Sequence, residues 1–167
     1  MDYPEIPKLA PHDTVVNPNL TDEVTLGAFF DWTTIEKDLG IHGTEEVNLA
    51  HLAIDRHASS HLKDKVALFW EGKNGESETY TFDELRTLTN KFANVLADLG
   101  VRKGDRVFTF AERLPELYVA VFGALKLGAI IGPLFADFGP DPVRDRLQDS
   151  GAKILVTTPA LKERIDP

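Results

Sequence analysis

Two histidines four residues apart, His57 and His61, have a spacing that could serve metal chemistry. On a helix they would share one face, as the two nitrogen ligands of a zinc site do. The sequence has neither the intervening glutamate nor the third ligand that make such a pattern specific. Ser59 and Ser60 lie beside the histidines, but residues one helical turn apart do not form an activated nucleophile. We therefore interpret the histidines as solvated or helix-capping residues.

Two pairs of acidic residues could serve general acid–base catalysis, namely Glu112 with Glu116 and Asp141 with Asp145. Each pair lies close to a proline that favours the first turn of a helix. Negative charge in a first turn stabilises the helix through its dipole. We interpret both pairs as helix-start charge.

Gly123 and Gly128 are five residues apart, as are the two glycines of a phosphate-binding loop. The lysine and the serine or threonine of that loop do not follow, and no G-x-G-x-x-G stretch occurs. Close packing explains these glycines better than phosphate binding.

Composition excludes several classes of function. The 167 residues include no cysteine and carry a formal charge of −9 with a pI near 5.0. A nucleic acid or an anionic membrane would demand clustered Lys and Arg, so neither is an expected partner. The N-terminus resembles no secretory signal, and we expect a cytoplasmic protein. The apolar window Leu117–Phe135 approaches membrane-spanning length, but Lys126, Gly128, Gly132 and Pro133 argue against a bilayer helix.

The first half of the chain predicts a helical extension followed by a hairpin. Residues 1–18 are proline-rich, and a short helix with anchors Phe29, Phe30 and Trp32 should stop at Gly40. Asn48 should cap a second helix that buries Leu49, Leu52 and Ala53. Two strand-like runs flank Asn74-Gly75, which favours a tight hairpin turn.

A capping box of Thr81 and Glu84 begins the next helix, which ends at Gly100. Apolar residues at steps of three and four should form its buried face. They are Leu85, Leu88, Phe92, Val95 and Leu99.

The second half alternates strands and helices. Strands are expected at 105–110, in "GAIIGPLF" and in "KILVTT", with helices from Pro115 to Leu127 and in "DPVRDRLQDSG", where Val143 and Leu147 point inward. This order predicts an α/β fold, a partial doubly wound parallel sheet preceded by a β-hairpin and a helical N-terminal extension. We expect an N-terminal extension at residues 1–47 and the first part of a larger domain at residues 48–167. A sheet of three apolar strands leaves an exposed edge, so we expect an incomplete part of a larger domain that tends to self-associate.

Several segments carry a family resemblance. The hairpin, the "YTFDEL" helix, "LGVRKGDRV" and the "LPELY" helix resemble the N-terminal third of the AMP-forming acetyl-CoA synthetases, members of the adenylate-forming acyl-CoA synthetase superfamily. The resemblance covers about residues 20–167, and "NLAHLAIDRH" with "FFDWTTIEKDLG" is similar to the acetyl and short-chain acyl branch.

The resemblance implies a reaction in two steps. ATP and a carboxylate form an acyl-adenylate and pyrophosphate, with Mg²⁺ accompanying the ATP, and the thiol of coenzyme A then displaces AMP. The family's phosphate loop and catalytic lysine lie beyond Pro167, so we expect no catalytic residue in this span and no activity or bound cofactor for the chain alone. The expected partners are the rest of the ligase chain and acetate.

The resemblance also implies contacts to coenzyme A. An "FGGF"-like turn in relatives lies beside the adenosine end of the coenzyme, and the matching positions here are Phe135, Ala136, Asp137 and Phe138. Two glycines are replaced, and Asp137 would repel a phosphate. Lys162 or Arg164 could match a basic segment that holds the phosphate of the coenzyme in relatives.

Two alternatives remain open at this point. One is a ligase of the same superfamily that acts on propionate or another short carboxylate. The other is a non-catalytic, flavodoxin-like interaction module.

Overall fold

The structure is a computed structural model, and it describes residues 31–44 and 46–165. The chain divides into two units, Met1–Glu45 and Glu46–Pro167. The described part of the first unit contains the helix α2 (Trp32–Leu39). Asp31 caps it by accepting a hydrogen bond from the Thr33 N–H at 3.0 Å, and Gly40 ends it with a φ of 71°. The expected stop at Gly40 is confirmed, while residues 1–18, Phe29 and Phe30 lie outside the described residues.

The second unit opens with a helix that Asn48 caps, as expected. Its Oδ1 accepts hydrogen bonds from the N–H groups of Ala50 and His51 at 3.0 and 3.1 Å. A π-helical turn, η2 (His51–Asp55), leads into the short α3 (Arg56–Ala58).

The wider turn of η2 changes which residues are buried. The expected stripe through Leu49 is wrong, because Leu49 is 61% exposed while Ala50, Ile54 and Ala58 are buried four residues apart. A π-helix has more residues per turn than an α-helix, so the buried positions move along the sequence.

The expected shared helical face of His57 and His61 is also wrong, since α3 ends at Ala58. The Ser60 hydroxyl donates to the His57 carbonyl at 2.8 Å, and the Ser60 N–H donates to the same carbonyl at 3.0 Å. Serine hydroxyls compete in this way for helical carbonyls and help to end the helix.

The hairpin consists of β1 (Val66–Glu71) and β2 (Ser77–Thr81), paired antiparallel as expected. Its loop is longer than a two-residue turn. The Gly75 N–H donates to the Gly72 carbonyl at 3.2 Å, and Gly75 then adopts a φ of 92°. A turn followed by a left-handed glycine is a common three-residue hairpin connection.

Helix α4 (Phe82–Asp98) begins with the expected capping box, in which the Thr81 N–H donates to Glu84 Oε2 at 2.8 Å. Its buried face differs from the expectation, because Val95 and Leu99 are 51% and 59% exposed. The buried residues are Leu85, Thr89, Ala93 and Leu96. Small side chains on this face allow α4 to approach the next helix closely.

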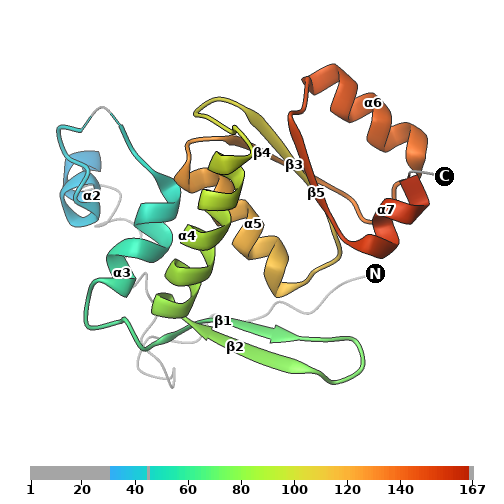
Figure 1. The fold of residues 1–167 in the computed structure, drawn as a ribbon. Coiled ribbons are helices and arrows are strands. Elements are labelled where there is room, and N and C mark those ends of the chain that lie inside the picture. The colour runs from blue at the N-terminus through green and yellow to red at the C-terminus, as the bar shows by residue number, and fades with distance from the viewer. Residues whose placement is uncertain (1–30, 45, 166–167) are drawn as a thin grey trace, which may run out of the picture. The chain divides into compact units, whose positions relative to one another are not determined.

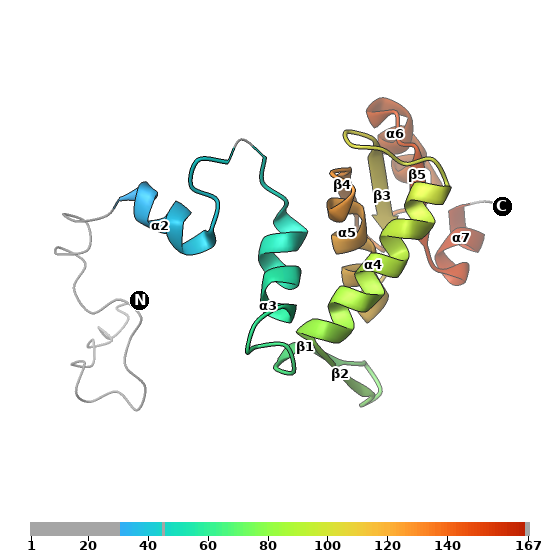
Figure 2. The same ribbon diagram turned by 60° about the vertical axis from the view of Figure 1, so that its left-hand side comes forward.

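The remaining elements form the expected parallel sheet. The strands are β3 (Arg106–Phe110), β4 (Ile130–Leu134) and β5 (Ile154–Thr157), in the order β4-β3-β5. The helices are α5 (Pro115–Lys126), α6 (Pro140–Ser150) and α7 (Pro159–Ile165). Figures 1 and 2 show α4 and α5 against one face of the sheet and α6 and α7 against the other.

Each face of the sheet has its own hydrophobic core. On the α5 side, Val107 packs with Leu96, Val101, Ala124 and Ala129. On the other side, Phe110 packs with Leu134, Val143 and Leu161. Two covered faces explain why the strands are continuous apolar runs rather than alternating ones.

The outer edges of the sheet differ. The N–H of Ile130 donates to the carbonyl of Asp105 at 2.8 Å, so alternate residues of β4, including Pro133, direct their backbone groups outward. The N–H of Lys153 donates to the carbonyl of Arg106 at 2.9 Å, so Ile154 and Val156 of β5 face outward in the same way.

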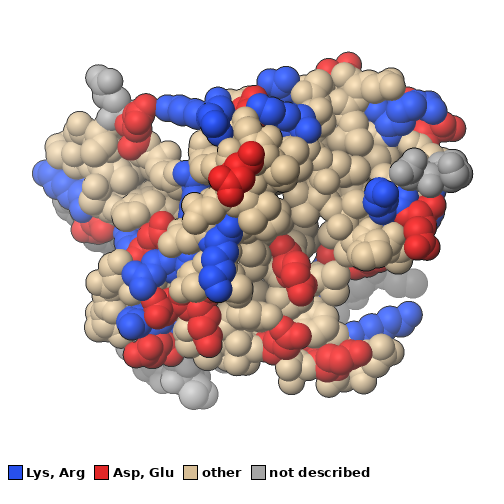
Figure 3. Space-filling model, in the orientation of Figure 1, with Lys and Arg blue, Asp and Glu red and all other residues tan. Residues whose placement is uncertain are grey.

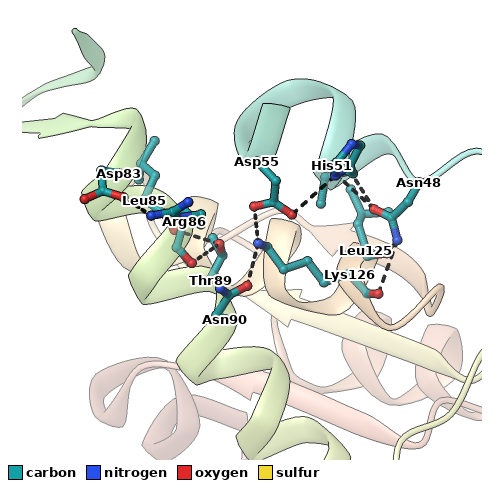
Figure 4. A network of polar contacts seen from close by, with 11 residues as sticks. Asn48, His51, Asp55, Asp83, Leu85, Arg86, Thr89, Asn90, Leu125 and Lys126 are labelled. Atoms are coloured by element: carbon teal, nitrogen blue, oxygen red, sulfur yellow. Dashed lines mark hydrogen bonds and ion pairs between the residues drawn. The ribbon is translucent and has the colours of Figure 1, made fainter. Parts of the chain in front are cut away.

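A polar network joins η2 to α4 and α5 (Figure 4). The Lys126 side chain is only 9% exposed, and its ammonium donates to Asp55 Oδ1 at 2.5 Å and to Asn90 Oδ1 at 2.6 Å. The Asn48 amide donates to the carbonyls of Leu125 and Lys126 at 3.1 and 3.2 Å, which satisfies the end of α5.

The apolar window at 117–135 is divided between a helix and a strand. It contains most of α5, a turn at Gly128 with a φ of 67°, and β4. Within residues 31–44 and 46–165, no helix has the length and apolar character needed to cross a membrane.

Candidate functional site

The turn that follows β4 presents two aromatic rings. Phe135 is 76% exposed, and its ring meets the Phe138 ring edge-on with centroids 5.6 Å apart. The Phe138 N–H donates to the Phe135 carbonyl at 3.0 Å and closes the turn. Among the described residues only glycines have positive φ, so Ala136 and Asp137 occupy the turn without backbone strain. The backbone of this turn therefore does not require glycine.

Two guanidinium groups lie beside this turn. Arg164 of α7 donates to the Ala136 carbonyl and lies 5.4 Å from the Phe110 ring centroid. Arg146 of α6 lies over the Phe138 ring, 4.5 Å from its centroid. Both contacts have the geometry of cation–π interactions. The structure thus joins Arg164 to the turn that the sequence analysis singled out.

Lys162 is an exposed residue of α7, two positions before Arg164. Residues two apart on a helix do not face the same way. Since Arg164 contacts the turn, the register favours Arg164 over Lys162 as the basic residue of this site.

Arg146 did not emerge from the sequence analysis. It precedes Leu147 and follows Val143 by three residues, so it flanks the stripe by which α6 contacts the sheet. This position could have indicated Arg146 from the sequence, because a long side chain at the edge of a buried helical stripe lies along the neighbouring surface.

The cluster of Phe135, Phe138, Arg146 and Arg164 combines flat apolar rings with positive charge. Such a combination suits a ligand that carries both a planar ring and an anionic group. Asp137 adds an exposed carboxylate within the same turn, which restricts where an anion could lie. On the face of the molecule in Figure 3, acidic and basic side chains of the described residues are interspersed.

Of the histidine and serine candidates, His57 and Ser60 have structural roles. The His57 ring packs against Phe82 with centroids 4.8 Å apart, and burial, with the nearby charges of Arg56 and Lys65, lowers the pKa of His57. In the part of the chain that the structure describes, no group of three or more His, Cys, Asp or Glu residues could hold a metal ion.

Three of the four paired acidic residues have partners in the fold, and of the four only Glu116 and Asp141 lie in a first helical turn, in α5 and α6. Arg144 contacts Asp141 at 2.7 Å and Asp145 at 3.0 Å. The Glu112 carboxylate lies 3.4 Å from the Thr158 hydroxyl.

The glycines have the packing roles expected of them. A side chain at Gly123 would approach Phe92 to 2.9 Å, and one at Gly128 would contact Lys103 at 3.1 Å. Gly128 also adopts the left-handed conformation at the end of α5.

A groove between β2 and α4 contains Tyr80, whose hydroxyl donates to the Glu78 carboxylate. This hydrogen bond, with burial and the charges of Glu78, Glu116 and Glu84, raises the pKa of Tyr80 to about 12. Because the pKa in the folded chain exceeds the ordinary value of 10.0, the bond contributes its full stability below pH 10 and loses it as the pH rises toward 12.

Glu78→Gln should therefore lower the pKa of Tyr80 toward its ordinary value. The measurement is a titration by tyrosinate absorbance in a chain whose other tyrosines, Tyr3 and Tyr118, are phenylalanine. Glu71→Gln is the control and should leave the titration unchanged. An unchanged Tyr80 pKa in Glu78→Gln would show that another contact holds the phenol proton.

The comparisons with known proteins identify a family. A model of the family described as AMP-binding enzyme matches residues 54–167. Acetyl-coenzyme A synthetase of Bacillus subtilis is 51% identical over 137 residues, which cover 81% of this chain and 24% of the relative. The 3-hydroxypropionyl-coenzyme A synthetase of Sulfurisphaera tokodaii is 42% identical over 119 residues, which cover 71% and 18%.

A solved structure agrees with these matches. The crystal structure of an acyl-CoA synthetase of Brucella canis superposes with a TM-score of 0.76 and 33% identity, covering 83% of this chain and 25% of the other. The chain thus spans about a quarter of the length of the Bacillus subtilis and Brucella canis proteins.

Proposed function

Because the chain belongs to the AMP-binding enzyme family, we propose that it forms the first part of the nucleotide-binding domain of an AMP-forming acetate–CoA ligase. The 51% identity to an acetyl-coenzyme A synthetase supports acetate as the acid. The activity would require the longer chain that the relatives have, together with ATP, Mg²⁺ and coenzyme A. The cytoplasmic location and the self-association of the shorter chain stay predictions.

The observation that carries this proposal beyond family membership is the contact between Arg164 and the turn after β4. Coenzyme A supplies the thiol that forms the thioester. The rings of Phe135 and Phe138 would hold its adenine by stacking, and Arg146 and Arg164 would offset the charge of its phosphate. Asp137 would keep the phosphate on the arginine side of the turn through repulsion.

In the longer ligase, Arg164→Ala should raise the KM for coenzyme A at least tenfold and leave the KM for acetate unchanged. The reason is that a guanidinium–phosphate contact is charge-assisted, and its loss costs roughly 1.5–3 kcal/mol. Steady-state assays of acetate- and ATP-dependent AMP formation measure both constants. Lys162→Ala is the matched control, because Lys162 faces another side of α7.

An equal rise in the KM for coenzyme A in both variants would show that general positive charge, and not the contact with the turn, binds the coenzyme. Unchanged constants in Arg164→Ala would remove the turn from the coenzyme site. The 167-residue chain by itself is expected to release no pyrophosphate with acetate and ATP.

Another short carboxylate is the second candidate substrate, because a 3-hydroxypropionyl-coenzyme A synthetase is 42% identical to this chain. Assays with acetate, propionate and 3-hydroxypropionate in parallel separate these candidates. The acid with the highest kcat/KM is the substrate, and no turnover with any of them would favour a non-catalytic module.

A further inference from the structure

A cavity of about 60 Å³ lies where β3 and β5 end, on the side of the sheet that α5 covers. Its walls are mainly apolar and come from both strands and from the first turns of α5. They include Thr109, Leu114, Leu117, Val156, Thr157 and Thr158.

The position of this cavity follows from the order of the strands. The connection from β3 through α5 to β4 covers one face, and the connection from β4 through α6 to β5 covers the other (Figures 1 and 2). The chain therefore reverses its winding between β3 and β5. In open α/β sheets, ligands bind beyond the carboxyl ends of the strands at such a switch point.

Two residues of the cavity wall, Thr109 and Thr157, have a hydroxyl without a hydrogen-bond partner within residues 31–44 and 46–165. Thr157 is opposite Phe110 in the register, so its side chain points to the other face of the sheet. Thr109 is 1% exposed, and its hydroxyl has no hydrogen-bond partner among the described residues. Thr109 is opposite Val156 in the sheet register, so both side chains point to the α5 side, where the cavity lies. A buried hydroxyl without a partner destabilises the folded chain, and a ligand that forms a hydrogen bond with it in the cavity would recover that free energy.

The charges around the cavity restrict the ligand. Glu116 lies in the wall, and the Glu112 carboxylate contacts Thr158 at 3.4 Å, while no Lys or Arg contributes to the described lining. An anion would be repelled by these carboxylates. A cation would lose its hydration against Leu114, Leu117 and Val156.

We propose that this cavity is a binding site for a small uncharged ligand, or ligand group, that carries both a hydrogen-bond donor and an acceptor, such as a primary amide or an alcohol. The Thr109 hydroxyl is its polar anchor, and the apolar walls contact its carbon atoms. This site is separate from the coenzyme site proposed above, because Phe110 and Phe138 pack on the opposite face of the sheet. The proposal therefore does not depend on that function.

Acetamide is the probe for the test, titrated into the isotope-labelled 167-residue chain and followed by backbone amide resonances. We expect saturable shifts at residues 109 and 156, and at least tenfold weaker binding in Thr109→Val, which keeps the side-chain shape. Propionate, the anionic probe, should produce no saturable shift at these residues.

Thr79→Val is the control for a threonine-to-valine change, because Thr79 is exposed on β2 and does not line the cavity. Acetamide binding should survive in this variant. Val156→Ile adds a methyl group to the cavity and should weaken binding with the hydroxyl still present, so the test stands even if Thr109→Val does not fold.

Two results would overturn the proposal. Equal acetamide affinity in the parent chain and in both cavity variants would place the binding elsewhere. No saturable shift in the parent chain would mean that water alone occupies the cavity.

Discussion

Replacement of Asp55 by alanine is expected to lower the free energy of unfolding by about 3 kcal/mol. The Lys126 side chain is 9% exposed, and Asp55 is its carboxylate partner at 2.5 Å. Without that carboxylate, an ammonium group with little access to water would keep only the neutral Asn90 as a partner. Urea denaturation followed by circular dichroism measures the loss.

The matched control removes an ion pair of similar length from the surface. Lys103 and Glu46 are 2.7 Å apart, but their side chains are 75% and 83% exposed, so Glu46→Ala should leave the unfolding midpoint unchanged. The double variant Asp55→Leu with Lys126→Met should recover most of the stability, because both charges are then removed together. A loss below about 1 kcal/mol in Asp55→Ala would show that Asn90 and solvent suffice for the ammonium.

Replacement of Gly123 by valine is expected to destabilise the chain by about 3 kcal/mol. Even the first added carbon would lie 2.9 Å from the Phe92 ring and 3.2 Å from the Thr89 carbonyl oxygen. The ring can rotate, but the carbonyl belongs to the backbone of α4, so the two helices must move apart. Thermal and urea unfolding both report this change.

Asn94→Val is the control for a valine side chain on a helix. Asn94 is exposed on α4, and asparagine and valine have similar helix propensities, so this change should alter the free energy of unfolding by less than roughly 0.5 kcal/mol. Gly123→Ala tests the sign of the effect. At an open helical position alanine gains about 1 kcal/mol over glycine, so a gain at position 123 would contradict the close helix contact.

Local sequence patterns predicted the elements with strong signals at their ends. The capping box of Thr81 and Glu84, the glycine at position 40 and the Asn74-Gly75 turn all lie where expected. The three parallel strands could be predicted equally well from the sequence, because apolar runs separated by helical patterns leave few alternative folds.

The errors arise where tertiary contacts override a regular period. The approach of α5 at Gly123 selects Thr89 and Ala93 for the buried face of α4 in place of Val95 and Leu99. In the helix that Asn48 caps, the π-helical turn η2 shifts the buried positions along the sequence. No local sequence signal marks such a turn.

For the candidate sites as well, some residues could be predicted from the sequence and others only from tertiary contacts. The turn at 135–138 could be proposed from a family pattern, whereas the choice of Arg164 over Lys162 required the orientation of α7. Nothing in the sequence selects Thr109 as a site residue, because threonine is common in strands. Its importance depends on a hydroxyl that finds no partner among the described residues.

The two edge strands of the sheet differ in how completely they could pair with a further strand. Pro133 occupies an outward position of β4 and has no N–H to offer, so a strand arriving there would miss one rung of the ladder. On β5, Ile154 and Val156 direct their backbone groups outward, and both have an N–H. A further strand would therefore form a more complete set of backbone hydrogen bonds beside β5 than beside β4.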